Sequence, residues 1–342
     1  MRKSNIELLR ILAMLMILGL HANYKSLGIP NSVDILDSPI PSFCRVSLEM
    51  ICIISVNVYV LISGWFTIKA SIKGICNFLF QVFFILIITY LIGIILGIEQ
   101  VTLKTIAQCL VIGENAWFVK SYIALYILSP LLNKFCQTSR KRQLEAVVIG
   151  FYVFQTIWGY SSGKYDVTLN GYSTFSFIGL YLLAQYIRKY GKKLFSIGKW
   201  LFIFSMILMI TTSYTALKYK IPFIGGYMMS YTNPLNIIAA TGFLLIFQKI
   251  KIKTSSIINY IASSSFAVYL FQDCIGWSEN LYTGLSKEIY QHYSGISYII
   301  NILGLLFLVF FLGILLDQFR KFFWRLLERY LTINHFFNKT VA

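Results

Sequence analysis

The stretch IELLRILAMLMILGLHAN, residues 6–23, contains enough apolar residues to cross a lipid bilayer as one helix. A hydrocarbon core about 30 Å thick requires roughly 20 helical residues. The same stretch carries Glu7, Arg10 and His21, although ionisable groups are costly at membrane depth. We therefore predict a membrane helix whose polar residues have a function inside the protein.

The composition of the whole chain is that of an integral membrane protein. Of its 342 residues, 57% are hydrophobic and only 13% are charged, and the mean hydropathy is +0.70. Soluble globular domains carry roughly 25% charged residues. Apolar runs recur along the full length, so no room is left for a large soluble domain.

Ten of these apolar runs are long enough to be membrane spans. They are aliphatic and aromatic with few charges, which favours helices over the alternating strands of a membrane barrel. We predict an all-α integral membrane protein with a single polytopic domain over residues 1–342. The predicted spans are 6–24, 46–68, 75–97, 117–135, 143–160, 172–189, 199–217, 232–250, 257–275 and 296–317.

The formal charge of +17 would suit a nucleic-acid partner, but its distribution indicates a membrane topology instead. Basic residues gather in every second connection between the predicted spans, and such connections are cytoplasmic by the positive-inside rule. Both termini are then cytoplasmic, and no nucleic-acid partner is expected. Residues 318–342 form a basic cytoplasmic tail, in which DQFRKFFWRLLERYL at 317–331 suits an amphipathic helix on the inner leaflet.

The six cysteines do not indicate a disulfide framework or a metal site. None is in the C-x-x-C spacing of zinc or redox sites, and several lie inside predicted spans. We expect free thiols and no bound metal. The cysteines are Cys44, Cys52, Cys76, Cys109, Cys136 and Cys274.

The polar residues of the first span share one helix face. Arg10 and His21 are eleven positions apart, which is three helical turns plus about 20°, or about 16 Å along the axis. Glu7 is three residues before Arg10 and can pair with it. The simple alternative is that Arg10 reaches the inner headgroups together with Glu7, while His21 caps the outer end of the span.

These residue types suit transfer of a group from a phosphate-bearing donor to a hydroxyl. Histidine is the commonest general base, and burial keeps the imidazole neutral and able to accept a proton. The guanidinium fork of Arg10, at the cytoplasmic end, matches phosphate geometry. Lys69 and Lys73 follow the second span on the same membrane side and could add to a phosphate site, although ordinary positive-inside charge also explains them.

Several motifs together resemble one family. Arg10 and His21 match the R-x10-H signature of the membrane acyltransferase 3 family, the acetyltransferases that decorate bacterial surface polysaccharides. VNVYVLISGWF at 56–66 resembles the family's second-span ending, and ENAWFVKSYIALYILSPLLNKF at 114–135 resembles an aromatic stretch that ends in Ser-Pro-Leu-x-Asn. SSSFAVYLFQD at 263–273 is similar to a late S-F-x-x-Y-L segment. The resemblance covers essentially all ten spans.

The resemblance implies an O-acetyltransferase of the bacterial cytoplasmic membrane, with acetyl-CoA as donor. The acceptor would be a sugar hydroxyl of a capsule, exopolysaccharide or other surface glycan, or of its lipid-linked precursor, with glycan-assembly proteins as further partners. Arg10, Lys69 and Lys73 would hold the nucleotide and phosphates. His21 would deprotonate the acceptor hydroxyl as it attacks the thioester.

Other motif positions have a functional and a structural interpretation. Trp117, Tyr122 and Tyr126 form an aromatic face that can stack on a sugar or pack against a neighbouring helix. The amides of Asn57 and Asn115 can bind acceptor hydroxyls, or can satisfy helix ends and helix crossings. Ser63 and Gly64 end the second span tightly, with a small-residue helix contact as the alternative.

The chain departs from the family pattern at two places. The late motif usually ends in histidine, where this chain has Gln272, so the role of a second imidazole cannot be transferred. Some members have paired arginines after the second span, where this chain has Lys69 and Lys73. Lysines bind phosphate only as point charges.

Two other classes of function are compatible with a polytopic helical protein. A transporter or flippase for a glycan or acylated intermediate would require related halves, interrupted helices and acid-based ion coupling, of which the spans show little. A non-catalytic scaffold would leave Arg10 and His21 without a purpose. Consumption of acetyl-CoA separates the acyltransferase from both.

Overall fold

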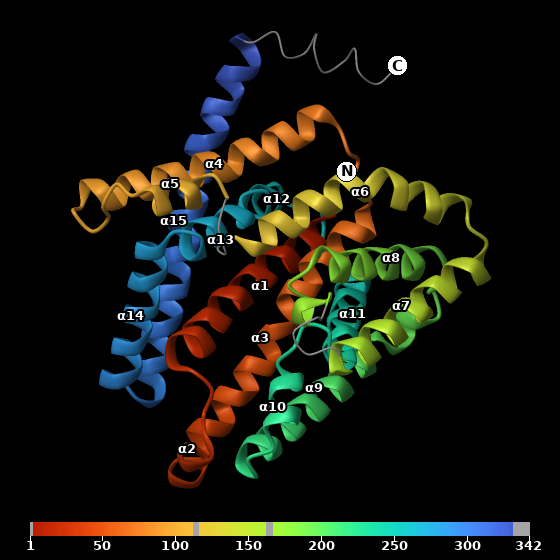
Figure 1. Cartoon of the computed structure of the whole chain (residues 1–342), viewed down its shortest axis with the longest axis horizontal. Coiled ribbons are helices and arrows are strands. Elements are labelled where there is room, and N and C mark those ends of the chain that lie inside the picture. The colour runs from red at the N-terminus through yellow and green to blue at the C-terminus, as the bar shows by residue number, and fades with distance from the viewer. Residues whose placement is uncertain (1–2, 112–115, 162–166, 331–342) are drawn as a thin grey trace. The chain divides into compact units, whose positions relative to one another are not determined.

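The computed structural model describes residues 3–111, 116–161 and 167–330 (Figure 1). Helix accounts for 84% of it, and these residues include no strand. This confirms the predicted all-α fold. The helices group into two compact units, one formed by residues 1–68 and 131–259 and the other by residues 69–130 and 260–342.

The first unit is built around two long helices from the N-terminal part of the chain. α1 (Ser4–Leu20) continues into a π-helical turn, η1 (His21–Lys25), and packs against α3 (Pro39–Phe66) (Figure 1). α8 and α11 also pack on α3, and α11 packs along α9. The other elements of this unit are α2 (Ser32–Asp37), α7 (Lys141–Ser161), η3 (Leu169–Gly171), α8 (Thr174–Tyr190), α9 (Leu194–Lys218), α10 (Pro222–Met228) and α11 (Pro234–Lys249).

The second unit contains the remaining helices. α13 and α15 pack together, and both contact α4. Two helices pass from one unit to the other: α6 (Trp117–Thr138) at Pro130 and α12 (Ser256–Ala262) at Asn259. The helices within the second unit are α4 (Ile72–Ile95), α5 (Leu103–Cys109), α13 (Ser265–Asp273), α14 (Gly276–His292) and α15 (Gly295–Tyr330).

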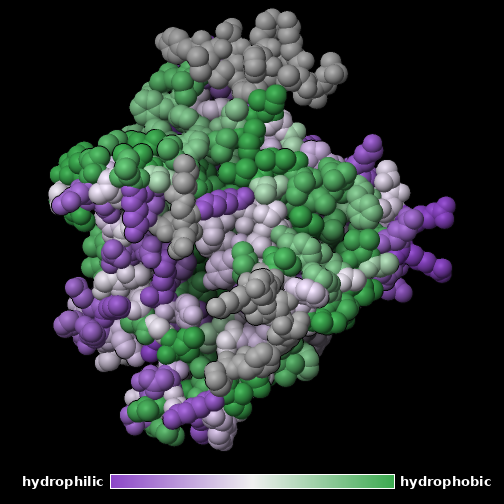
Figure 2. All heavy atoms as spheres, viewed as in Figure 1, coloured by the Kyte–Doolittle hydropathy of each residue, from purple (hydrophilic) through white to green (hydrophobic). Residues whose placement is uncertain are grey.

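Five of the described helical segments are long and apolar enough to cross a membrane: Ser4–Lys25, Pro39–Phe66, Ile72–Ile95, Leu194–Lys218 and Gly295–Arg329. Figure 2 shows large apolar areas on the visible face, and many large hydrophobic side chains are exposed along these segments. Lipid is the medium in which such a surface is stable. The count of ten spans and the cytoplasmic termini remain predictions.

The predicted span over 257–275 is interrupted. α12 ends at Ala262 and α13 begins at Ser265, so that Ser263 and Ser264 lie in the break. Both serine hydroxyls accept from the Lys321 ammonium, each at 2.6 Å. The Ser263 and Ser265 hydroxyls also donate to the carbonyl oxygens three residues before them, and such side-chain bonds to the backbone compete with regular helical structure.

The described residues that follow the last predicted span belong to the same helix as that span. α15 runs through to Tyr330 as one helix, and Arg320 is 4% exposed. The Arg320 guanidinium donates to Asp317 at 2.9 Å and to Asn77 of α4 at 2.8 Å. The Asp317 carboxylate also accepts from Gln81 at 2.8 Å. This part of the helix is therefore anchored inside the second unit, because a buried ion pair needs such a set of partners.

Close helix packing in the first unit depends on glycine. α9 and α11 lie side by side, with Gly198 and Gly242 at the contact (Figure 1). A methyl group added at Gly242 would lie 2.7 Å from the backbone nitrogen of Phe202 and 2.8 Å from the carbonyl oxygen of Gly198. Small residues at membrane helix contacts allow backbones to approach in this way.

We expect Gly242→Ala to lower the thermal stability of the protein, since overpacking against a backbone costs about 1–3 kcal/mol. Gly150 of α7 is the matched control because an added methyl group would meet nothing within 4 Å there. Gly150→Ala should leave the unfolding temperature unchanged or raise it, because alanine is favoured over glycine in a helix by up to about 1 kcal/mol. Thermal unfolding in detergent, followed by tryptophan fluorescence, measures both. Equal effects of the two variants would contradict the close contact.

Candidate functional site

Arg10 and Glu7 form an ion pair near the start of α1. The distance between Arg10 Nη1 and Glu7 Oε2 is 3.1 Å, as the three-residue spacing predicts. The Glu7 side chain is 4% exposed, whereas Arg10 is 25% exposed. The carboxylate therefore lies inside the protein and accepts from one nitrogen of the guanidinium, which carries further donors, on a side chain that is partly exposed.

His21 lies where the regular α-helix ends. α1 is α-helical to Leu20, so the helical spacing that relates Arg10 to His21 extends without interruption to the histidine. His21 is half-buried and begins the π-helical turn η1, and its carbonyl oxygen accepts from the Ser26 hydroxyl at 2.8 Å. Single π-turns inside helices occur frequently at functional sites.

A buried polar network fixes this π-turn to α3. The Asn23 amide, 3% exposed, donates to the Glu49 carboxylate at 2.9 Å and to the Arg45 carbonyl oxygen at 3.0 Å. The Arg45 guanidinium in turn donates to the Gly28 carbonyl oxygen at 2.6 Å. Asn23, within the π-turn, and Gly28, just after it, are thus both bonded to residues of α3.

Sequence reasoning did not assign Asn23 and Glu49 to the site. The signal that identifies Glu49 is that it is one of few acidic residues inside a predicted span. Its partner was not predictable, because the pairing with Asn23 depends on how α1 and α3 cross.

The other predicted site residues of the first unit lie at helix contacts. The Asn57 amide is buried and donates to the Tyr231 carbonyl oxygen and to Asn236 Oδ1, both at 3.0 Å, which joins α3 to α11. A methyl group at Gly64 would lie 2.6 Å from the Tyr181 carbonyl oxygen of α8. The Ser63 hydroxyl donates to the carbonyl oxygen one turn before it. For Gly64 the structure supports the small-residue contact.

The two lysines proposed to bind phosphate belong to the second unit and differ in environment. Lys73, in the first turn of α4, pairs with Glu328 of α15 at 2.7 Å. Lys69 precedes α4 in an extended connection and is exposed. An anionic ligand would have to compete with Glu328 for Lys73, whereas Lys69 presents its ammonium to solvent.

The predicted aromatic face of α6 is divided among several neighbours. Tyr122 lies in an aromatic cluster, with its ring 5.3 Å from Phe78 and 6.0 Å from Phe118. The Tyr126 hydroxyl bonds to the backbone of Ser71. Trp117 is half-buried at the first turn of α6, 5.8 Å from Phe118. Asn115 lies outside the described residues.

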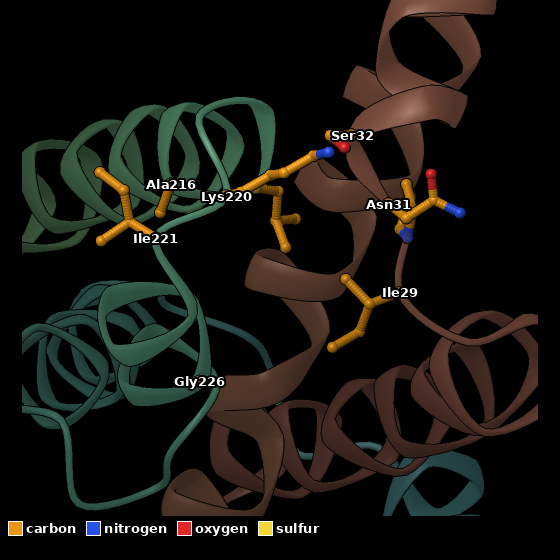
Figure 3. A pocket seen from close by; sticks show the side chains of 9 residues that line it. Ile29, Asn31, Ser32, Ala216, Lys220, Ile221 and Gly226 are labelled. Atoms are coloured by element: carbon orange, nitrogen blue, oxygen red, sulfur yellow. The ribbon is translucent and has the colours of Figure 1, made fainter.

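The first unit has a cavity of about 530 Å³ beyond the π-turn (Figure 3). One wall is the segment from Ile29 to Ser32, and the other is the end of α9 with the segment after it. The Lys220 ammonium points across the cavity toward Ser32 in Figure 3. The wall that contains Ile29 directly follows the carbonyl groups held by Arg45, so the network that fixes the π-turn also shapes this cavity.

The second unit has an apolar cavity of about 350 Å³ that is lined by Gln272. This residue stands where the family usually has histidine, and it is buried in α13. Its neighbours in the lining are almost all apolar, including Trp277, Leu281 and Val309. An amide cannot act as a general base, so Gln272 does not replace an imidazole chemically.

Within the described residues, no group of three or more His, Cys, Asp and Glu side chains could hold a metal ion. All six cysteines are free. Of the ionisable groups in α1 and η1, Arg10 suits an anionic group and His21 suits proton transfer.

Comparison with known proteins gives one match. The sequence model of one family, described as an acyltransferase domain, matches residues 3–318. This range includes α1 to α14 and most of α15. No curated protein and no solved structure matches the chain.

We expect Asn23→Ala to destabilise the protein and to lower its activity. The change leaves the Glu49 carboxylate and the Arg45 carbonyl without the donor they share, and an unsatisfied buried group costs about 1–3 kcal/mol. Asn301→Ala is the control, because the Asn301 amide bonds to Ser297 of its own helix at an exposed position. Thermal unfolding of both variants tests the expectation, and an unfolding temperature for Asn23→Ala equal to that of the control would refute it.

Proposed function

Because the chain belongs to the membrane acyltransferase 3 family, we propose that it transfers an acetyl group from acetyl-CoA to a sugar hydroxyl of a cell-surface glycan. Membership supports acyl transfer by a multi-pass membrane protein. We propose further that the transferred group is acetyl, that the acceptor is a glycan, and that the protein lies in the bacterial cytoplasmic membrane. A capsule or exopolysaccharide chain, or its lipid-linked precursor, is the acceptor that the family resemblance favours.

The observation that carries the proposal is the placement of His21. It is the one histidine of the sequence that falls in a predicted span, and it lies on the same helix as Arg10. The π-turn that begins at His21 is held by Asn23 and by Arg45. A general base acts only when it is held within reach of the proton it removes, and this network restricts the backbone that positions the ring.

In the proposed reaction His21 accepts the proton of the acceptor hydroxyl. The hydroxyl oxygen attacks the thioester carbonyl carbon, a new carbon–oxygen ester bond forms, and the carbon–sulfur bond breaks. The coenzyme A thiolate leaves and receives the proton from the imidazolium, which restores neutral His21. The step therefore balances without a metal ion or a redox partner.

The donor would be held by cations. Arg10, oriented by Glu7, supplies a guanidinium for the phosphates, and Lys69 and Lys73 supply ammonium groups. Trp117 and Asn115 are the candidates for contact with the acceptor sugar, because aromatic rings stack on sugars and amides bind hydroxyls. Tyr122, Tyr126 and Asn57 already pack or bond within the protein, so we assign them a supporting role, as we do Ser63 and Gly64.

His21→Ala should abolish transfer of labelled acetyl from acetyl-CoA to glycan in membranes of a complemented deletion strain. General-base catalysis contributes about 10²–10⁴-fold, so the loss should be at least about 100-fold. His292→Ala is the matched control because His292 lies exposed on α14 and bonds to its own helix. Normal labelling by His21→Ala at equal protein amount would remove His21 from the mechanism. Lack of labelling by the wild-type protein would favour transport instead.

Arg10→Lys should raise the KM for acetyl-CoA and leave the KM for the acceptor unchanged. Lysine keeps the charge near Glu7 but cannot bind phosphate bidentately, and the loss of one charge-assisted hydrogen bond corresponds to about tenfold. Arg140→Lys is the control, since Arg140 is exposed between α6 and α7. Steady-state kinetics with varied acetyl-CoA measure the effect. A raised KM for the acceptor alone would place Arg10 at the other substrate.

A further inference from the structure

The connection between α3 and α4 is anchored to the protein at both ends. We call residues 68–71 the strap; it follows Thr67, whose φ of 61° marks a sharp change of chain direction after α3. Lys69 lies in the strap and Lys73 lies just beyond it. Short connections of this kind are usually mobile unless their backbone groups are bonded.

The first anchor holds Ile68. Its backbone N–H donates to the Tyr181 hydroxyl at 2.8 Å, and its carbonyl oxygen accepts from the Asn133 amide at 2.9 Å. The Tyr181 hydroxyl donates to Asn133 Oδ1 at 2.7 Å, so the two side chains also fix each other. Tyr181 is fully buried, and both backbone polar groups of Ile68 are therefore bonded inside the protein.

The second anchor holds Ser71. Its backbone N–H donates to the Tyr126 hydroxyl at 3.0 Å, and the same hydroxyl donates to the Ser71 carbonyl oxygen at 3.1 Å. The Ser71 hydroxyl then accepts from the Gly74 N–H, which caps α4. A side chain at Gly74 would collide with the Tyr126 hydroxyl, because an added methyl group would lie 2.3 Å from it.

Both anchors use α6. Tyr126 and Asn133 are seven residues apart, which is about two helical turns or roughly 10 Å on an ideal helix. Pro130 lies between them and cannot donate to the Tyr126 carbonyl oxygen, which accepts instead from the Ser129 hydroxyl at 2.7 Å. The proline position is thus satisfied locally, and α6 continues to Thr138.

We propose that Tyr126, Asn133 and Tyr181 are positioning residues that hold the strap so that Lys69 meets the acyl donor in a fixed place. This inference rests on the proposed function, because it takes the donor to be an acyl-CoA bound in part by Lys69. Only Lys69 and Ala70 lie between the anchored residues, and both are exposed. A cation on a fixed backbone binds an anion more tightly because less entropy is lost on binding.

The ion pair of Lys73 with Glu328 supports this assignment. Lys73 already has an anionic partner at 2.7 Å, whereas Lys69 is exposed within the strap. Of the two lysines that follow α3, Lys69 is therefore the one whose position depends on the anchors. Asn133, the last residue of the Ser-Pro-Leu-x-Asn motif, thereby has a role in holding the strap.

The test is binding of acetyl-CoA to the full-length protein in lipid nanodiscs, together with steady-state kinetics. Tyr181→Phe and Asn133→Ala should each raise the Kd and the KM for acetyl-CoA by about three- to tenfold, the range expected when a neutral hydrogen bond is lost. The KM for the acceptor should stay unchanged. The matched controls are Tyr190→Phe on α8 and Gln137→Ala on α6, and neither side chain bonds to the strap among the described contacts.

A double-mutant cycle with Lys69→Ala separates positioning from general loss of stability. If the anchors act through Lys69, Tyr181→Phe adds little to the Kd once Lys69 is absent. Full additivity, or an unchanged Kd in Tyr181→Phe and Asn133→Ala at wild-type thermal stability, overturns the inference. If the wild-type protein binds no acetyl-CoA, the proposed donor is wrong and the inference falls with it.

Gly74→Ala tests the second anchor without changing a hydrogen-bonding side chain. The added methyl group displaces the Tyr126 hydroxyl from Ser71, so the Kd for acetyl-CoA should rise as in the other variants. Gly304→Ala, where an added methyl group meets nothing within 4 Å, is the control. A wild-type Kd in Gly74→Ala would show that the Ser71 anchor plays no part in donor binding.

Discussion

The constraint on which this structure depends is that polar groups in hydrocarbon need partners inside the protein. Lipid offers no hydrogen bonds, so each polar side chain in a span must be satisfied by another part of the chain. Glu7 has Arg10, and Asn23 has Glu49. In the second unit Arg320 has Asp317. Of these pairs, Asn23 with Glu49 joins two elements, because it links the π-turn to α3.

This constraint explains why the candidate functional residues lie where helices end or change geometry. Within a regular helix the backbone groups bond to one another and need nothing else. The His21 carbonyl oxygen accepts from the Ser26 hydroxyl, and Arg45 bonds to the Gly28 carbonyl oxygen just after the π-turn. In the strap, Asn133 and Tyr181 bond to the backbone of Ile68. Irregular backbone at such places is stable only because a dedicated network completes it. The cost of that network is understandable if the irregular segments carry the chemistry.

Much of the fold was predictable from the sequence because hydropathy and helix length determine it directly. The all-α class and the helices that cover 6–24, 46–68 and 75–97 follow from apolar length alone. The ion pair of Glu7 with Arg10 also follows, because a three-residue spacing on one helix sets their distance. The motifs that resembled the family gave acyl transfer, and the family match over residues 3–318 agrees.

What the sequence could not give depends on tertiary contacts. At the break between α12 and α13, Lys321, more than fifty residues later, bonds to the hydroxyls of both Ser263 and Ser264. The burial of Arg320 in what looked like a surface tail depends on Asn77 of another helix. Lys69 and Lys73 have the same residue type and lie four positions apart, but Lys73 pairs with Glu328, whereas Lys69 lies in the strap.

The strap also has a place in the topology that its short length conceals. The chain passes from the first unit to the second between Ile68 and Lys69, and α6 passes between them at Pro130 and Leu131. The crossing in α6 lies between Tyr126 and Asn133, and the crossing in the strap lies between Ile68 and Ser71. Asn133 bonds to Ile68, and Tyr126 bonds to Ser71. The proposed base, His21, belongs to the first unit, and the proposed donor lysines belong to the second. The backbone beside each crossing is bonded within its own unit, Ile68 to Asn133 and Ser71 to Tyr126, so polar groups that a connection would otherwise leave unpaired are satisfied there.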